Sequence, residues 1–396
     1  MTKRFAAARL PGPLAVVGSM YFFVFMGSGA FTPFINLYFS RLGFSGVQIG
    51  SLAAIGVLVG TVAAFFWAAL ADGYRLHNRI LSLTLLLTSL SILLIYRANG
   101  YDSIVVLFAL VYFAMSPVLA LIDSSTLELV KLYNSSYGAM RLWGSIGWSV
   151  STWVTGWLIQ QSGAHWLFYG SAAALGVTFV LSFLLPPRLP AIRTSAAGGL
   201  RRLIRGDMVI FLVSIFLLSA TSSAVTSFFS IYLDHIGADE ALIGLNWTFA
   251  AVSEIPLMFY SGALIKRFGA GKLLAVSFAL YALRWFLYSF IEVPVLVLAV
   301  QLIGGFSFAL FLTSGIAYVS QRAPAGLTTT ALLIFNTVVF GVAGIAGSMA
   351  GGYLFDQVGM QGLFRVVTLL ALAGLGLFAL APRAAAAAAP AAVAPQ

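Results

Sequence analysis

The sequence predicts an all-α integral membrane protein with twelve transmembrane helices arranged as two pseudo-symmetric six-helix bundles. Three observations support this fold class. The 396 residues are 61% hydrophobic and only 8% charged, too apolar for a chain of this size to fold in water. Apolar runs of about 20 residues recur along the chain, the length of helix that crosses a hydrocarbon core of ~30 Å. The second half also repeats features of the first at a nearly fixed offset.

The apolar runs are too long and unbroken for barrel strands, so we expect every span to be a helix. In chain order the expected spans are Leu14–Ser40, Gln48–Leu70, Ile80–Tyr96, Ser103–Val130, Tyr137–Gln161, Trp166–Leu185, Met208–Leu233, Leu242–Ile265, Leu273–Phe290, Val295–Val319, Leu327–Phe355 and Leu363–Leu380. They divide the chain into a first bundle (1–185), a polar, basic linker (186–207), a second bundle (208–383) and an Ala/Pro tail (384–396). The low complexity of that tail predicts disorder.

The internal repeat is visible in two places. YFSRLGFSGVQIG at Tyr38–Gly50 aligns with YLDHIGADEALIG at Tyr232–Gly244, where a tyrosine, a glycine and an Ile-Gly pair share the offset 194. Gly156 and Gly352 are related by the offset 196. Six-span halves repeated in this way predict a pseudo-two-fold axis along the membrane normal.

The net charge is +10, and the distribution of the basic residues along the chain indicates a membrane topology. With the amino terminus inside the cell, most basic residues, including Arg201 and Arg202, fall in inner segments, which is the positive-inside bias. We therefore expect both termini in the cytoplasm of a multi-pass plasma-membrane protein of the bacterial inner-membrane type. The expected partners are the lipid bilayer and a small-molecule solute, with no nucleic acid. The absence of cysteine excludes disulfides and thiolate metal sites.

Two loops carry a first resemblance. AALADGYRLHNR at Ala68–Arg79 is similar to the loop between the second and third spans of the major facilitator superfamily, although two of that motif's glycines are missing. GALIKRFG at Gly262–Gly269 is its counterpart in the second half. The resemblance implies a cytoplasmic gate formed by Asp72, Arg75, Arg79, Lys266 and Arg267. The alternative is an ordinary solvated loop.

Three further segments narrow the resemblance. YFFVFMGSGAFTPFINLY from Tyr21, YGAMRLWGSIGW from Tyr137 and KRFGAGKLLAVSFALYALR from Lys266 resemble the oligosaccharide:proton symporters and the phenylpropionate-permease group, and loosely the nucleoside:proton symporters. This likeness implies a monomeric secondary transporter, not an enzyme, that works by rocker-switch alternating access. It further implies uptake of a sugar, nucleoside or aromatic carboxylate, with a proton gradient in place of any cofactor. A proton-driven exporter of drugs or lipophilic compounds is the alternative.

Four charged residues lie within the expected spans: Asp123, Arg141, Glu254 and Arg284. A charge at mid-membrane costs about 2.5–3.5 kcal/mol on insertion scales, so each requires a reason. Glu254 lies about 18 Å into the eighth span and Arg284 about 17 Å into the ninth, which places both near mid-depth. Because these spans are antiparallel neighbours, we expect the two side chains at one height.

Arg141 follows Asp123 by 18 residues. The oligosaccharide symporters have a substrate-binding carboxylate and arginine at this spacing, so the resemblance implies that Asp123 orients Arg141 to hold the solute. Trp148 shares the Arg141 face two turns later and matches that family's aromatic platform for a sugar ring. The alternatives are a snorkelling arginine, a structural pair and a packing tryptophan. Arg284, Gln301 and Asn246 complete the predicted solute contacts, although an interhelix hydrogen bond alone would explain either amide.

The tenth span departs from the oligosaccharide symporters. It lacks the histidine and carboxylate that couple transport to protons there; the matching positions lie close to Gly304 and Ser307. We therefore expect Glu254 to be the proton-coupling residue, with Asp123 as the second candidate. A glutamate that stays protonated and hydrogen-bonded without a function is the alternative.

Overall fold

The computed structural model describes residues 12–74, 76–186, 206–324 and 327–380, and all regular structure in these ranges is helical. The helices are α1 (Gly12–Arg41), α2 (Gly46–Tyr74), α3 (His77–Arg97), α4 (Tyr101–Met115), α5 (Val118–Leu132), α6 (Tyr137–Ser162), α7 (His165–Ser182), α9 (Gly206–His235), α10 (Glu240–Phe268), α11 (Ala270–Tyr288), α12 (Pro294–Arg322), α13 (Thr328–Asn336), the π-helix η1 (Thr337–Val342) and α14 (Ala343–Leu380). The predicted tail and nearly all of the predicted linker lie outside the described residues.

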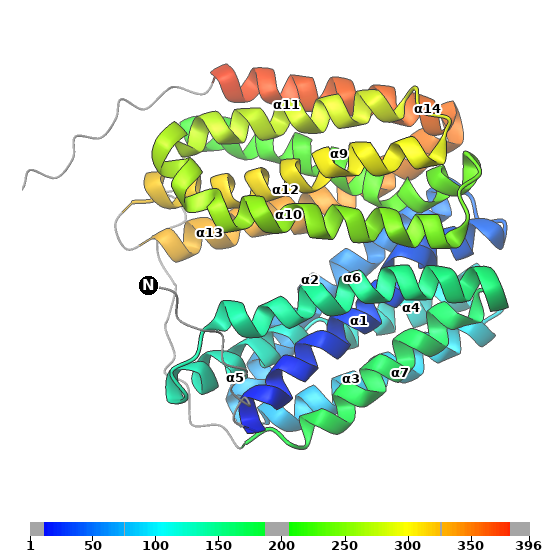
Figure 1. Cartoon of the computed structure of the whole chain (residues 1–396), viewed down its shortest axis with the longest axis vertical. Helices are drawn as coiled ribbons and strands as arrows, with labels where there is room; N and C mark the ends of the chain where they lie inside the picture. Colours follow the sequence, from blue (N-terminus) through cyan, green and yellow to red (C-terminus); the bar gives the residue numbers. More distant parts are fainter. Residues whose placement is uncertain (1–11, 75, 187–205, 325–326, 381–396) are drawn as a thin grey trace, which may run out of the picture.

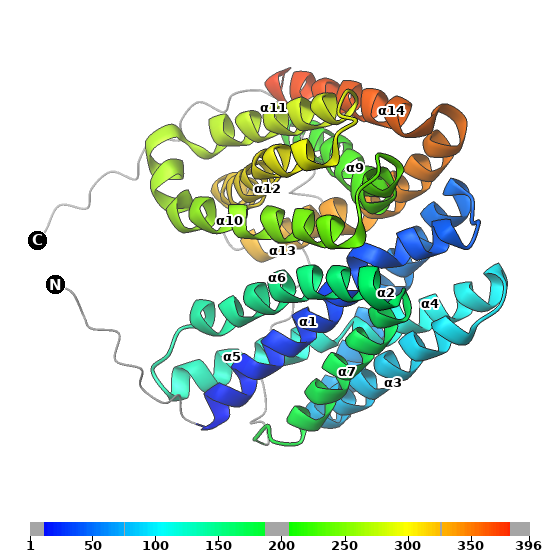
Figure 2. The ribbon, with the colours of Figure 1, turned by 45° about the vertical axis from the view of Figure 1, so that its right-hand side comes forward.

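The helices form two groups. Figure 1 shows α1 to α7 together in one part of the molecule and α9 to α14 in the other, and the turned view in Figure 2 shows the same division. Within the first group α1 packs against α6 and α7, and within the second α9 packs against α14 and α12 against α10 and α11. Between the groups α6 contacts α10 and α2 contacts α14. These two contacts are called the α6–α10 seam and the α2–α14 seam.

Ten helical segments in the described chain are long and apolar enough to cross a membrane, which confirms a multi-pass helical protein. The expected fifth span, α6, is a continuous helix but is not one of the ten, since it is rich in serine, threonine and glycine. The last segment, Thr328–Leu380, covers both the eleventh and twelfth expected spans and is kinked at Gly359, where φ is +67°. The expected fourth span is interrupted at Pro117, between α4 and α5.

Glycines bring the backbones of the α6–α10 seam into direct contact. A Cβ atom at Gly156 would lie 2.2 Å from the carbonyl oxygen of Glu240, and one at Gly244 would lie 2.1 Å from that of Thr152. No larger side chain fits at either position unless the helices separate. Small residues at such positions are the usual means of close helix approach in membranes.

The α2–α14 seam repeats these contacts at equivalent positions. A Cβ at Gly352 would lie 2.1 Å from the carbonyl oxygen of Gly46, and one at Gly50 would lie 2.3 Å from that of Ser348. The offsets 194 and 196 found in the sequence relate each of these contacts to one in the first seam. Four of the repeated glycines are therefore residues at which the two groups touch: Gly50, Gly156, Gly244 and Gly352.

Polar contacts join the groups at the same end of the molecule, which we call the closed end and define by Arg41, Asp234 and Glu240. The Arg41 guanidinium pairs with Asp234 at 2.5 Å and with Glu240 at 2.7 Å. The Asp356 carboxylate of α14 accepts the backbone N–H groups of Gly46 and the next residue, at 2.6 and 2.8 Å, and so caps the amino terminus of α2. Because exposed ion pairs contribute at most about 1 kcal/mol, we assign closure of this end mainly to the glycine contacts.

The Gly352→Ala substitution tests the role of these glycines. The added methyl meets the Gly46 carbonyl, so we expect the α2–α14 seam to open and the closed form to lose about 1–3 kcal/mol. Spin labels at Gln161→Cys and Val358→Cys, exposed on either side of the seams in a chain without native cysteine, report the separation. Gly376→Ala on the same helix, where a Cβ meets nothing within 4 Å, is the control. Equal label distances in the two variants would contradict the expectation.

Candidate functional site

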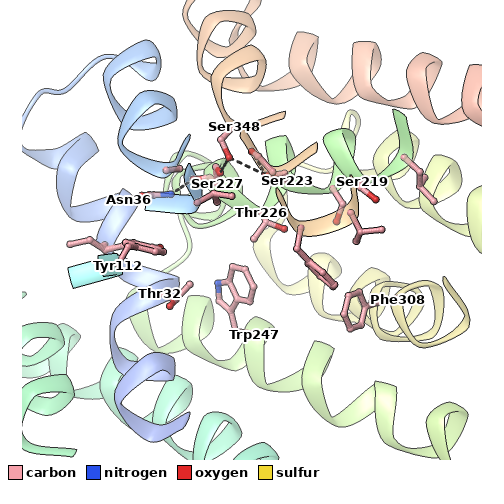
Figure 3. A pocket seen from close by; sticks show the side chains of 18 of the residues that line it. Thr32, Asn36, Tyr112, Ser219, Ser223, Thr226, Ser227, Trp247, Phe308 and Ser348 are labelled. Carbon is pink, nitrogen blue, oxygen red and sulfur yellow. Dashed lines mark hydrogen bonds between the residues drawn. The ribbon is translucent and has the colours of Figure 1, made fainter. Parts of the chain in front are cut away.

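A central cavity of about 320 Å³ lies between the two groups, and Figure 3 shows it at close range. Both groups contribute its walls. The labelled lining residues are Thr32 and Asn36 of α1, Tyr112 of α4, Ser219, Ser223, Thr226 and Ser227 of α9, Trp247 of α10, Phe308 of α12 and Ser348 of α14. The full lining combines serine and threonine hydroxyls with an equal number of aromatic rings, the Asn36 amide and several aliphatic side chains, a composition suited to a solute that contains both a ring and polar groups.

The hydroxyl groups come mainly from one face of α9, where polar residues recur at the three- and four-residue spacing of a helix. Some are held by hydrogen bonds: the Ser223 and Ser227 hydroxyls lie 3.0 and 3.1 Å from Ser348 Oγ, and Asn36 Nδ2 donates to the Ser227 carbonyl at 2.9 Å. Ser219 Oγ is buried without a partner in the described chain. This face therefore both fixes α9 against its neighbours and leaves hydrogen-bonding capacity toward the cavity.

A second cavity of about 190 Å³ adjoins the first and shares part of its lining, including Trp247. It brings together three of the residues predicted from the sequence: Glu254 of α10, Arg284 of α11 and Gln301 of α12. We call this the charged cavity. It lies within the second group, whereas the central cavity that it joins is lined by both groups.

Neutral partners hold the Arg284 guanidinium in the charged cavity. Its NH2 group donates to Gln301 Oε1 at 2.6 Å, its Nε donates to the Tyr288 hydroxyl at 3.0 Å, and that hydroxyl donates to the same Gln301 oxygen at 3.0 Å. The Arg284 Cζ atom also lies 4.7 Å from the centre of the Trp285 ring. A Cβ at Gly304 would lie 2.7 Å from Cζ, so the tenth span has room for this arginine where a larger residue would clash.

Glu254 is half-buried and lines the same cavity as Arg284. Glu254 and Arg284 form no ion pair within 4 Å in the described chain. The carboxyl group therefore lines the same cavity as the guanidinium without being paired to it.

The structure places Asp123, Arg141 and Trp148, the other predicted solute-binding residues, outside both cavities. Asp123 Oδ1 accepts hydrogen bonds from the hydroxyls of Tyr21 and Tyr137, the latter at 3.0 Å. The Arg141 guanidinium lies over the Phe25 ring, with Cζ 4.1 Å from its centre. The predicted orientation of the Arg141 fork by Asp123 is therefore not seen, because the tyrosines occupy Oδ1 and the guanidinium stacks on an aromatic ring. Neither residue lines the central or the charged cavity, and Trp148 does not either.

Asn246 is fully buried and donates to the Leu242 carbonyl of its own helix at 2.9 Å. It lines neither cavity, so this structure gives it no solute contact. Of the predicted gate residues, the side chains of Asp72 and Arg75 lie outside the described residues. Arg79, Lys266 and Arg267 are exposed and form no ion pairs within the described ranges. These three residues are therefore not ion-paired with one another or with another described residue, as a closed gate would require.

Two features of the site were not predicted from the sequence. Trp247 lines both cavities, and its indole N–H donates to Ser230 Oγ at 3.1 Å, which fixes the ring. It lies seven residues before Glu254, the same spacing as between Arg141 and Trp148, so the signal was present. The polar face of α9 was likewise visible as serines and threonines at helical spacing within an apolar run.

Comparison with known proteins identifies the family of this chain. The MFS_1 like family matches residues 14–366. The maltose permease of Geobacillus stearothermophilus is 31% identical over 355 residues, covering 87% of this chain and 89% of that protein. The chain therefore belongs to the MFS_1 like family of major facilitator transporters and is a transport protein, not an enzyme.

Two further comparisons concern more distant proteins. A probable 3-phenylpropionic acid transporter of Escherichia coli K12 is 24% identical and covers 90% of this chain and 95% of that one. The crystal structure of the nucleoside transporter NupG superposes with a TM-score of 0.82 at 17% identity, covering 93% of this chain and 99% of that one. The structural similarity shows a shared fold.

The Gln301→Leu substitution tests the hydrogen-bonded arrangement of the charged cavity. Leucine leaves the Arg284 guanidinium and the Tyr288 hydroxyl without their acceptor, so we expect a loss of about 1–3 kcal/mol in unfolding free energy. Gln301→Glu keeps an acceptor oxygen and is expected to lose less. Thermal unfolding in detergent checks this, with exposed Gln161→Leu as the control. Unfolding of Gln301→Leu at the wild-type temperature would show that Gln301 does not support Arg284.

Proposed function

We propose that this protein is a proton-coupled importer of a small polar solute that contains a ring: a sugar, a nucleoside or an aromatic carboxylate. One observation carries the proposal: Glu254 shares a cavity with Arg284 and Gln301, and this cavity joins a hydroxyl-lined cavity between the two helix groups. The names of the relatives, which refer to maltose, 3-phenylpropionic acid and nucleosides, support the same solute classes.

A single coupling carboxyl group is sufficient for uphill uptake. One elementary charge moved through ~100 mV releases ~2.3 kcal/mol. At 1.4 kcal/mol per tenfold change, this free energy supports about 50-fold accumulation. We assign this role to Glu254, which would exchange its proton for closer contact with Arg284, and we keep Asp123 as the second candidate.

The proposed architecture has twelve spans in two pseudo-symmetric bundles, with α6 as the fifth span and the kink at Gly359 separating the last two. The equivalent glycine contacts of the two seams support this symmetry. The positive-inside bias supports cytoplasmic termini in a bacterial inner membrane, which makes the closed end the outer end. Rocker-switch movement of a monomer would open the seams and close the opposite end, where Arg79, Lys266 and Arg267 lie. Asp72 and Arg75 complete the proposed gate.

Two sets of residues are candidates for holding the solute, and the set that lines the cavities is favoured. Arg284 offers a planar fork for hydroxyl or carboxylate oxygens, Gln301 an amide, and Trp247 a ring for stacking. Arg141, Asp123 and Trp148 form the second proposed set, in the first group. The Arg141 guanidinium rests on an aromatic ring and has no carboxylate partner within 4 Å in the described chain.

The Glu254→Gln variant tests proton coupling. Glutamine mimics the protonated carboxyl group, so we expect loss of uphill accumulation while downhill exchange is largely retained. Uptake of labelled maltose, uridine and 3-phenylpropionate into proteoliposomes, with and without an imposed proton gradient, measures both. Exposed Glu292→Gln is the matched control and Asp123→Asn tests the second candidate. Wild-type accumulation by Glu254→Gln would exclude Glu254 as the proton site, and gradient-driven efflux would favour an exporter.

Substitution of the two tryptophans distinguishes the solute-binding sets. Trp247 lines both cavities whereas Trp148 lines neither, so Trp247→Ala is expected to weaken binding of the transported solute at least tenfold, or about 1.4 kcal/mol. Trp148→Ala is expected to bind within about threefold of wild type. Titration calorimetry in detergent compares them. A larger loss in Trp148→Ala would place the main contact beside Arg141 instead.

A further inference from the structure

A third cavity lies entirely within the first helix group. Its volume is about 210 Å³, and it is lined by residues of α1, α3, α4 and α7. We call it the side chamber. It shares two lining residues, Thr32 and Tyr112, with the central cavity, so the two spaces meet at these side chains. Neither Glu254, Arg284 nor Gln301 lines it.

Most of the chamber wall suits an aromatic ring. Phe31, Tyr112 and Met115 provide aromatic and sulfur contacts, and three aliphatic side chains add to them. The remaining lining residues are Gly27 and four serines and threonines. An engineered apolar cavity of about 150 Å³ is known to bind benzene, so a chamber of 210 Å³ has space for one six-membered ring with a substituent. Because the chamber is built inside one group, it does not depend on the seams between the groups.

One polar group in the wall is unsatisfied. Ser171 is fully buried and lines the chamber, and its Oγ has no hydrogen-bond partner in the described chain. Two other hydroxyls of the wall differ: Ser28 donates to the Val24 carbonyl at 3.0 Å and Thr88 to the Thr84 carbonyl at 2.7 Å. A buried hydroxyl without a partner is costly, and Ser171 retains one donor and two acceptor lone pairs.

We propose that the side chamber binds a small aromatic ring with one polar substituent, which hydrogen-bonds Ser171. It would receive the aromatic part of a solute whose hydroxyl-bearing part occupies the central cavity. This second role rests on the proposed transport function, whereas binding of the ring itself does not. The solutes selected in this way would be two-part molecules such as aryl glycosides.

The direct test measures binding of 4-fluorophenol to the full-length protein by fluorine NMR, with empty micelles subtracted. Val111 lines the chamber and is 5% exposed, whereas Val106 on the same helix is 67% exposed. Val111→Phe fills the chamber, so binding is expected to weaken at least about tenfold, while Val106→Phe stays within about twofold. Equal affinity of Val111→Phe and wild type, or equal weakening in both variants, would overturn the site.

Ser171→Ala tests the polar contact separately. Loss of one hydrogen bond is expected to weaken 4-fluorophenol binding about threefold to tenfold and to leave fluorobenzene binding unchanged. Equal weakening of both ligands would contradict the role of Ser171.

Displacement of 4-fluorophenol tests the link to the solute. Phenyl β-glucoside is expected to displace 4-fluorophenol because it carries an aromatic ring, whereas methyl β-glucoside is expected not to displace it. Displacement by methyl β-glucoside alone, or by neither compound, would overturn the role of the chamber in solute recognition. Because displacement is measured on the wild-type protein and needs no proton gradient, its outcome does not depend on whether Glu254→Gln loses coupled uptake, so failure of coupling and failure of the chamber are distinguishable.

Discussion

The backbone contact between the two helix groups is the constraint on which the rest of the structure depends. At four glycines, a Cβ would lie within 2.3 Å of a carbonyl oxygen on the facing helix. Apolar side chains gain little from leaving lipid for one another, so close packing must provide the attraction between helices in a membrane. The seams bring α6 to α10 and α2 to α14 at one end, and the central cavity lies between the groups that they join. A transporter needs such a contact to be tight yet separable, and close backbone packing supplemented by a few polar side-chain contacts satisfies both requirements.

The chemistry of the cavities follows from where polar groups can be supported. Arg284 is tolerable inside the membrane because Gln301, Tyr288 and the ring of Trp285 surround its guanidinium. Gly304 provides the space, which gives a physical reason for the missing titratable residue in the tenth span. Proton coupling is then assigned to Glu254 on α10, which packs against α12. The polar face of α9 supplies hydroxyl groups without introducing further charge.

Much of this could be predicted from the sequence. Composition and apolar run length indicated a helical membrane protein, and the offset between Gly156 and Gly352 identified residues that occupy equivalent contacts. The free-energy cost of a charged side chain inside the membrane identified Glu254 and Arg284 as candidates, and the structure brings them into one cavity. The partners of Asp123 could not be predicted, because Tyr21 lies on another helix, 102 residues away. Trp247 was missed because its seven-residue spacing from Glu254 does not by itself distinguish lipid contact from cavity contact until helix rotation is known.

Proton movement driven by solute alone is the most direct test of coupling at the charged cavity. Wild-type proteoliposomes without an imposed proton gradient would receive external maltose, uridine or 3-phenylpropionate while a pH-sensitive dye reports the external medium. Symport predicts alkalinisation of the medium that follows solute entry and is lost in Glu254→Gln. Solute entry into wild-type vesicles without any pH change, or with equal changes in the variant, would contradict coupling through Glu254.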